Sequence, residues 1–240
     1  MSLYLGEKKV GTNNTIVKGV PKEKFGATVD TFLGEVDENG EYSQPSVGWH
    51  FDGSSIKKIP NNGMNSRFYR SGVTSVDLSN LEWVGASGLQ TAFSTNNITG
   101  HLDLGKLEYI GTSGMTTAFS GCHITSVDLG NLKQVLGGSL RSAFYSNKVA
   151  MVDLSNLATV PAGAINTMFQ GNTPENGRVD VYLPADGSGW DSGAMSATVW
   201  GNSTTITEIH FSAHSEEWVS KQTGYASKFG ATSSTIYFDL

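Results

Sequence analysis

The sequence is poor in cysteine, proline and charge. Its 240 residues include a single cysteine, Cys122, and six prolines. One cysteine excludes a disulfide framework within the chain and a zinc site built from several cysteines. Charged residues make up 16%, and 16 lysines and arginines against 22 aspartates and glutamates give a net charge of −6. Because nucleic-acid binders are usually basic, this acidic balance predicts no nucleic acid partner.

Long apolar runs are also missing. No stretch of 18 apolar residues occurs, so we expect no membrane-spanning helix. The opening MSLYLGEKKVG has no basic stretch followed by an apolar core, so we expect no signal peptide and leave the compartment open. Hydrophobic residues still make up 38%, enough for a core in a chain of this length. The 29 glycines are an excess over average usage and are typical of a fold with many tight turns.

The middle of the chain repeats itself with a period of about 25 residues. Four units begin with an apolar β-branched residue, at Val73, Ile98, Ile124 and Val149. Each unit carries one leucine at a matching position, in the order Leu78, Leu104, Leu129 and Leu154. Each also carries one phenylalanine at a later matching position, in the order Phe93, Phe119, Phe144 and Phe169. Such a period indicates stacked structural repeats rather than a single irregular domain.

Each unit combines two kinds of periodicity. Segments such as Val76-Asp77-Leu78 alternate apolar and polar residues, which predicts a half-buried strand. Further on, Leu89, Ala92 and Phe93 stand at i, i+3 and i+4, which predicts a short helix. Ser87, and Ser113 in the next unit, occupy the position of a helix N-cap. Since one unit cannot bury both faces alone, we expect the units to stack with parallel strands about 4.8 Å apart.

The units resemble the BspA-like branch of leucine-rich-repeat proteins. The resemblance rests on the strand, on Leu-x-x-Val or Leu-x-x-Ile, and on Ala-Phe followed three residues later by Asn or Cys, over roughly residues 54–211. It implies an α/β fold: a right-handed leucine-rich-repeat solenoid of parallel strands with short helices or turns. In this family the Asn or Cys side chain lies inside the turn and bonds backbone groups of the neighbouring coil. The matching residues form a structural ladder of Asn96, Cys122, Asn147 and Asn172.

The ends of the chain depart from the pattern. We interpret residues 1–53 as an N-terminal cap or attachment segment, with a short helix near residues 29–36, and residues 54–240 as the solenoid. A degenerate first coil is indicated by Ile56, Ile59, Met64 and Phe68. Atypical capping coils at the other end take strands from residues 179–183, 206–211 and 236–240.

One column of candidate site residues is acidic: Asp77, Asp103, Asp128 and Asp153. On adjacent strands these carboxylates lie about 5 Å apart, a spacing compatible with a cation site or a retaining glycosidase pair. The alternative is structural, with each carboxylate accepting hydrogen bonds from the turn that follows its strand. The column is expected to continue as Tyr182 and His210, and His101 lies on the same face.

A second column pairs Trp83 with Tyr109 and continues as Gln134 and Thr159. Adjacent exposed aromatic rings suit stacking on sugar rings or a hot spot for a protein partner. The alternative is that the rings only shield the edge of the first coils.

Signatures of catalysis and cofactor binding are missing. The five histidines show no HExxH spacing, and no phosphate loop, dinucleotide fingerprint or Gly-x-Ser-x-Gly occurs, so we expect no metal and no cofactor. Cys122 fits the ladder as a buried thiol rather than a nucleophile.

These observations favour a non-enzymatic binding or adhesion module with a protein or glycan ligand. The alternatives are a phage or prophage virion or assembly component, suggested by a loose similarity of the N-terminal segment, and a polysaccharide-acting enzyme. The family resemblance favours the cell surface or a virion as location. The oligomeric state stays open.

Overall fold

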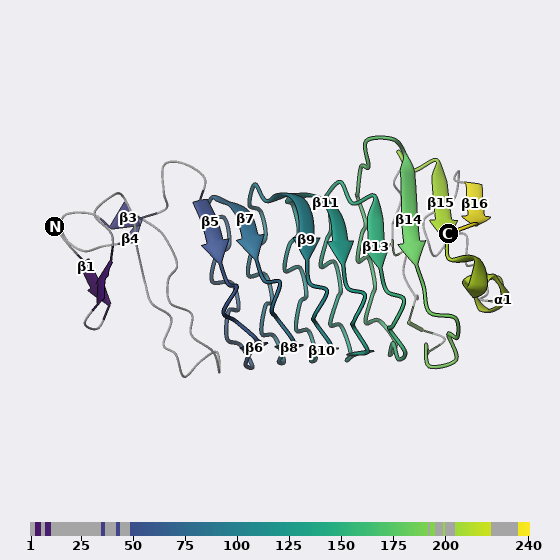
Figure 1. Cartoon of the computed structure of the whole chain (residues 1–240), viewed down its shortest axis with the longest axis horizontal. Helices are drawn as coiled ribbons and strands as arrows, with labels where there is room; N and C mark the ends of the chain where they lie inside the picture. The colour runs from purple at the N-terminus through teal and green to yellow at the C-terminus, as the bar shows by residue number, and fades with distance from the viewer. Residues whose placement is uncertain are drawn as a thin grey trace.

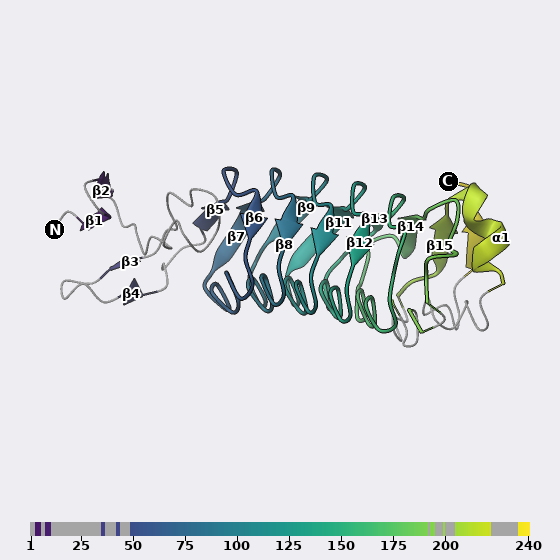
Figure 2. The ribbon, with the colours of Figure 1, turned by 90° about the horizontal axis from the view of Figure 1, so that it is seen from below.

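The computed structural model describes residues 3–5, 8–10, 35–36, 42–43, 49–191, 193–194, 199, 205–221 and 235–240. From residue 49 onward they form a solenoid of parallel strands with about seven turns of about 25 residues each. Figures 1 and 2 show the coils following one another along the long axis. The predicted period and the parallel stacking are therefore confirmed.

One wall of the solenoid contains the longer strands, side by side in Figure 1. They are β5 (Trp49–Asp52), β7 (Val73–Asp77), β9 (Thr99–Asp103), β11 (His123–Asp128), β13 (Met151–Asp153), β14 (Arg178–Tyr182), β15 (Glu208–Phe211) and β16 (Thr235–Phe238). One six-stranded parallel sheet contains β9, β11, β13, β14, β15 and β16, and β5 pairs in parallel with β7. Because equivalent residues lie in register on successive strands, one column of the sequence becomes one row on this wall.

A second wall consists of two-residue strands. They are β6 (Lys58–Ile59), β8 (Trp83–Val84), β10 (Tyr109–Ile110) and β12 (Gln134–Val135), and they form a four-stranded parallel sheet. Isolated bridges from Gln134 to Thr159 and from Val160 to Trp190 continue the row. The second residue of each strand faces the core, and the first faces outward.

The third wall contains turns where the sequence analysis expects helices. Within residues 87–95 the amide N–H of every second residue, among them Gly88 and Ala92, donates to the carbonyl three residues back. The N–H groups of the intervening residues, among them Leu89 and Phe93, donate to carbonyls of the next coil. This alternation satisfies the backbone without a helix. In the part of the chain that the structure describes, helix is confined to one 3-10 turn, Ala213–Ser215, and α1 (Glu216–Val219).

The physical reason for this correction is a four-residue backbone repeat. Every fourth residue of the wall has a positive φ, as at Ser87 (53°), Thr91 (57°) and Thr95 (58°). A left-handed residue at the third position of a tight turn reverses the chain locally and prevents a helix from propagating. Four-residue turns and helices both place apolar groups at i and i+4, so spacing does not separate them. Ser87 and Ser113 (φ 54°) are therefore left-handed turn residues, not N-caps. The helical part of the predicted α/β class is wrong.

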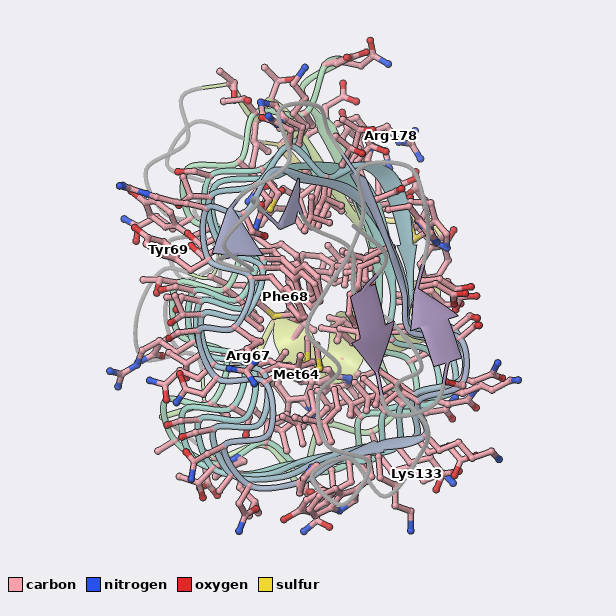
Figure 3. The ribbon with its side chains drawn as sticks, turned by 90° about the vertical axis from the view of Figure 1, so that its left-hand side faces the viewer. Met64, Arg67, Phe68, Tyr69, Lys133 and Arg178 are labelled. Carbon is pink, nitrogen blue, oxygen red and sulfur yellow. The ribbon has the colours of Figure 1, made fainter. Side chains whose placement is uncertain are left out.

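The core runs the length of the solenoid and contains the phenylalanine column. Phe93, Phe119, Phe144 and Phe169 are at most 1% exposed. Their neighbouring rings stack almost in parallel, with centroids 5.3, 5.9 and 5.5 Å apart. Viewed along the axis, Phe68 and Met64 of the first coil lie inside the same space (Figure 3). Stacked rings and aliphatic columns thus fill each coil against its neighbours.

The solenoid begins earlier than residue 54. Strand β5, Trp49–Asp52, already pairs in parallel with β7, so the first coil has a complete strand rather than a trimmed one. At the other end, β14, β15 and β16 confirm the three expected strands. Within the N-terminal segment, β1 (Leu3–Leu5) pairs antiparallel with β2 (Lys8–Val10), and β3 (Glu35–Val36) with β4 (Tyr42–Ser43). The helix expected near residues 29–36 falls outside the described residues except for β3, which is a strand.

Candidate functional site

The acidic column lies at the C-terminal ends of the longer strands. Asp103, Asp128 and Asp153 are in register on β9, β11 and β13. Asp77 is in register with Asp52 on the two-stranded sheet of β5 and β7, so the row begins one coil earlier than the sequence analysis places it.

Each carboxylate of the row is held by the turn that follows its strand. The Oδ1 atom accepts the amide N–H two residues later, at 3.0 Å in Asp77, 2.9 Å in Asp103, and 2.8 Å in both Asp128 and Asp153. In the first coil the hydroxyl and amide of Ser54 bond Asp52 in the same way and lower its pKa. These are Asx turns, in which the side chain replaces a backbone acceptor.

The repeated turn leaves the carboxylates alike. A glycosidase needs two carboxyl groups with different surroundings, one of them protonated at working pH. A hard cation needs several oxygen ligands converging on one point. Across the residues that the structure describes, no group of three or more His, Cys, Asp or Glu side chains is arranged to hold a metal ion. The geometry of the row therefore fits the structural interpretation of the column.

His101 lies on the same wall and is tied to the next coil. Its Nδ1 atom lies 2.8 Å from Ser126 Oγ, and His50 and Ser75 form the same pair at 2.8 Å. The histidine is thus one member of a repeated surface bond.

The expected continuation of the acidic row is half right. Tyr182 is in register with Asp153, as expected. His210 instead pairs with Asp180, two positions earlier on the strand, because β15 aligns with Val179 and Val181 in this register. His210 therefore does not belong to the acidic row.

Trp83 and Tyr109 meet on the second wall. They occupy the outward positions of β8 and β10, in register, and both are half-buried. Their rings are nearly parallel, with centroids 5.6 Å apart and an interplanar angle of 8°. Each ring therefore covers one face of the other.

Ion pairs border the two rings. Glu82, next to Trp83, accepts from Lys57 Nζ at 2.8 Å, and Glu108, next to Tyr109, accepts from Lys133 Nζ at 2.9 Å. The hydrogen bond from Lys57 lowers the pKa of Glu82. The second wall thus presents an aromatic centre with a charged rim.

The asparagines of the ladder lie inside the solenoid and bridge coils. The Oδ1 atom of Asn147 accepts the Ile124 N–H at 3.0 Å, and its Nδ2 donates to the Phe119 carbonyl at 2.8 Å, both in the preceding coil. Asn96 and Asn172 make the equivalent bonds one turn earlier along the chain, to Val73 and Phe68 and to Val149 and Phe144. Each side chain therefore satisfies buried backbone groups at the corner between the turn wall and the wall of longer strands.

Cys122 replaces asparagine in one coil. Its thiol donates a long 3.4 Å hydrogen bond to the Phe93 carbonyl, and its side chain is 3% exposed. Burial raises the pKa of the thiol from 9.0 to about 11. A thiol that stays protonated is a poor nucleophile.

The sequence analysis missed a hollow between β13 and β14. Its volume is about 250 Å³, and it is lined by Thr125, Lys148, Ala150, Glu175, Asn176, Arg178 and Asp180. A sequence signal for it exists: one residue separates Asn147 from Val149, whereas six separate Asn172 from Val179. An insertion at a fixed point of a repeat usually forms a loop on one face.

A scan of protein-family models finds no match to the chain, and a search of curated proteins finds none either. In the described part of the chain, no helix has the length and apolar character needed to cross a membrane.

Proposed function

We propose that the chain is a non-enzymatic binding module whose rigid solenoid presents its second wall to a protein partner. The observation that carries this proposal is the half-buried, parallel pair of Trp83 and Tyr109. Aromatic side chains at the centre of a surface with a polar rim are typical of protein interfaces. Here the rim consists of the Lys57–Glu82 and Lys133–Glu108 ion pairs.

The stacking geometry favours a protein over a glycan at these two rings. A sugar ring needs an open aromatic face, and each of the two rings already covers one face of the other. Ring edges instead suit edge-to-face contacts with aromatic side chains of a partner. The Asx turns of the acidic row support the non-enzymatic part of the proposal, since they hold its carboxylates in similar surroundings.

The test is a binding panel of purified proteins and glycans, measured with the wild type and three variants. We expect Trp83→Ala to weaken binding of a protein ligand about thirtyfold, as loss of a hot-spot residue does. Gln134→Ala is the matched control, because Gln134 is an outward residue in the same row. Asp103→Ala is expected to bind like the wild type. The proposal fails if no protein binds, or if Trp83→Ala binds as tightly as Gln134→Ala.

We also infer that the repeat is a right-handed member of the BspA-like leucine-rich-repeat family. The bonds of Asn96, Asn147 and Asn172 into the preceding coil support it, since the family's asparagines have this role. Parallel strands joined by crossovers are right-handed in nearly all proteins, which supports the handedness.

The virion or assembly component remains the alternative proposal. The segment that suggests it, residues 1–42, lies mostly outside the described residues. Size-exclusion chromatography with light scattering separates the two. A trimer or higher oligomer favours the assembly component, and a monomer at all concentrations counts against it.

A further inference from the structure

The hollow between β13 and β14 forms where the shape of the repeat changes. In earlier coils at least two residues stand between the inward residues of the strand, as Ala150 and Met151 do between Val149 and Val152. In β14 only Asp180 stands between Val179 and Val181. The loss of this extra residue leaves a step in the wall, and such irregularities often re-aim side chains at binding sites.

An inserted loop forms the rim of the step. It contains Glu175 and Asn176, both exposed, and closes with a turn from the Gly177 N–H to the Pro174 carbonyl. Gly177 has a φ of +69°, and a Cβ atom there would lie 2.7 Å from Thr207 Oγ1, so the loop's close fit against the next coil needs glycine. The rim is thus anchored on the solenoid rather than hanging free.

Two cations and two carboxylates line the hollow as two ion pairs, one loose and one tight. Lys148 Nζ lies 3.7 Å from Glu175 Oε1, with side chains 41% and 76% exposed. Arg178 Nε donates to Asp180 Oδ1 at 2.7 Å, with side chains 46% and 26% exposed. The Asp180 hydrogen bond raises the pKa of Arg178, so the guanidinium stays charged.

Both cations keep donors for a ligand. Within the described part of the chain, the guanidinium of Arg178 bonds through Nε only, and Lys148 lies too far from Glu175 for a short hydrogen bond. A guanidinium with free amino groups matches the two oxygens of a carboxylate. Around it, Asp180, Glu175 and Asn176 offer acceptors for hydroxyl groups, and Ala150 offers an apolar patch.

We propose that this hollow is a binding subsite for a uronic acid, a sugar of single-ring size that carries both a carboxylate and several hydroxyls. Its volume of about 250 Å³ is below that of drug-sized pockets, which limits the ligand to about one ring. The carboxylate bonds Arg178 and Lys148, and the hydroxyls bond the acceptors of the rim. The site lies on the strand wall, away from Trp83 and Tyr109, so it does not depend on the proposed protein-binding face.

The test titrates full-length protein with glucuronate, glucose and a glucuronate-terminated disaccharide, using ligand-observed NMR and calorimetry. A ligand of this size at ordinary efficiency has a Kd of about 1 mM. We expect glucuronate to bind in that range, and glucose at least tenfold more weakly because it lacks the carboxylate. The proposal is overturned if the two sugars bind equally. It is also overturned if glucuronate does not bind at a concentration 20-fold above the expected Kd of about 1 mM.

Three variants locate the site. Arg178→Gln and Lys148→Gln should each weaken glucuronate binding at least fivefold. Lys221→Gln is the control, since it also removes a lysine from an exposed ion pair, with Glu217, but lies just after α1 and outside both proposed sites. Unchanged thermal unfolding shows that Arg178→Gln is folded. If Lys221→Gln weakens binding as much as Arg178→Gln, or if neither hollow variant does, the assignment is wrong. The disaccharide arm distinguishes a glycan end, which binds more tightly, from the free sugar.

Discussion

Replacing Asn147 with alanine tests whether the buried ladder holds neighbouring coils together. The side chain is 2% exposed and bonds the N–H of Ile124 and the carbonyl of Phe119 in the preceding coil. Alanine removes the side-chain oxygen and nitrogen that make these bonds. Two buried backbone groups are then left without this partner.

The expected cost follows from those two groups. Each unsatisfied buried polar group costs about 1 to 3 kcal/mol, and a water entering the vacated space recovers part of it. We therefore expect Asn147→Ala to lower the free energy of unfolding by about 2 to 4 kcal/mol, a large share of the 5 to 15 kcal/mol typical of a domain. Because each coil contacts only its neighbours, the weakened interface should also broaden the transition by uncoupling the two halves of the stack.

Urea unfolding followed by far-UV circular dichroism measures both effects. Asn131→Ala is the matched control, because the Asn131 side chain also donates to a carbonyl of the preceding coil, that of Gly105, but lies on the exposed surface. We expect the control to lose no more than about 0.5 kcal/mol. If Asn147→Ala loses no more than Asn131→Ala, the ladder does not stabilise the stack as argued.

Two further predictions concern Gly177 and Cys122. Gly177→Ala should lower the free energy of unfolding by about 1 to 3 kcal/mol, since φ is +69° and the new Cβ atom meets Thr207 Oγ1 at 2.7 Å. Gly137→Ala has no atom within 4 Å of the new Cβ and should leave Tm unchanged; equal shifts would contradict the argument. Burial raises the pKa of Cys122 from 9.0 to about 11, so the unfolded state loses this proton first and stability should fall as pH rises from about 9 to 11. In urea unfolding at several pH values, the free energy of unfolding of the wild type should fall more steeply with pH than that of Cys122→Ala. Parallel slopes for the two proteins would rule out the buried thiol as the cause.

The stacking of the coils was predictable because residues that recur at the same position of each repeat must occupy the same place in each coil. The phenylalanines of the repeat, Phe93 among them, lie in one stacked column, and Trp83 meets Tyr109 as their positions require. Strand β5 was not predictable, since Trp49–Asp52 lacks the leucine that marks the later strands. The helices were wrongly predicted because a four-residue turn and a helix share the i to i+4 spacing of Leu89 and Phe93.

The candidate sites were predictable only where they repeat. The acidic row follows from the period, but its Asx turns depend on backbone geometry that alternation does not encode. His210 was misplaced because the repeat is longer at this end: paired residues of β14 and β15 are 30 positions apart, so Ser212 rather than His210 matches Tyr182. The hollow arises where one coil differs from its neighbours. Alignment of the repeats by their shared residues does not reveal such a difference.

The turn wall limits how the perimeter of a coil can change. Its left-handed residues recur every four positions, and neighbouring amides alternate between bonding within the coil and bonding to the next one. An insertion of one residue there would exchange the two sets of amides and break both patterns, whereas an insertion of four would add a whole turn and preserve them. The coil from Ile98 to Ile124 is one residue longer than the coils on either side of it and carries the added residue in its strand segment, where Gly100 has a φ of +80° and no atom crowds its Cβ position. Coils of this kind can therefore widen in steps of four residues on the turn wall, while single-residue changes are confined to the wall of longer strands.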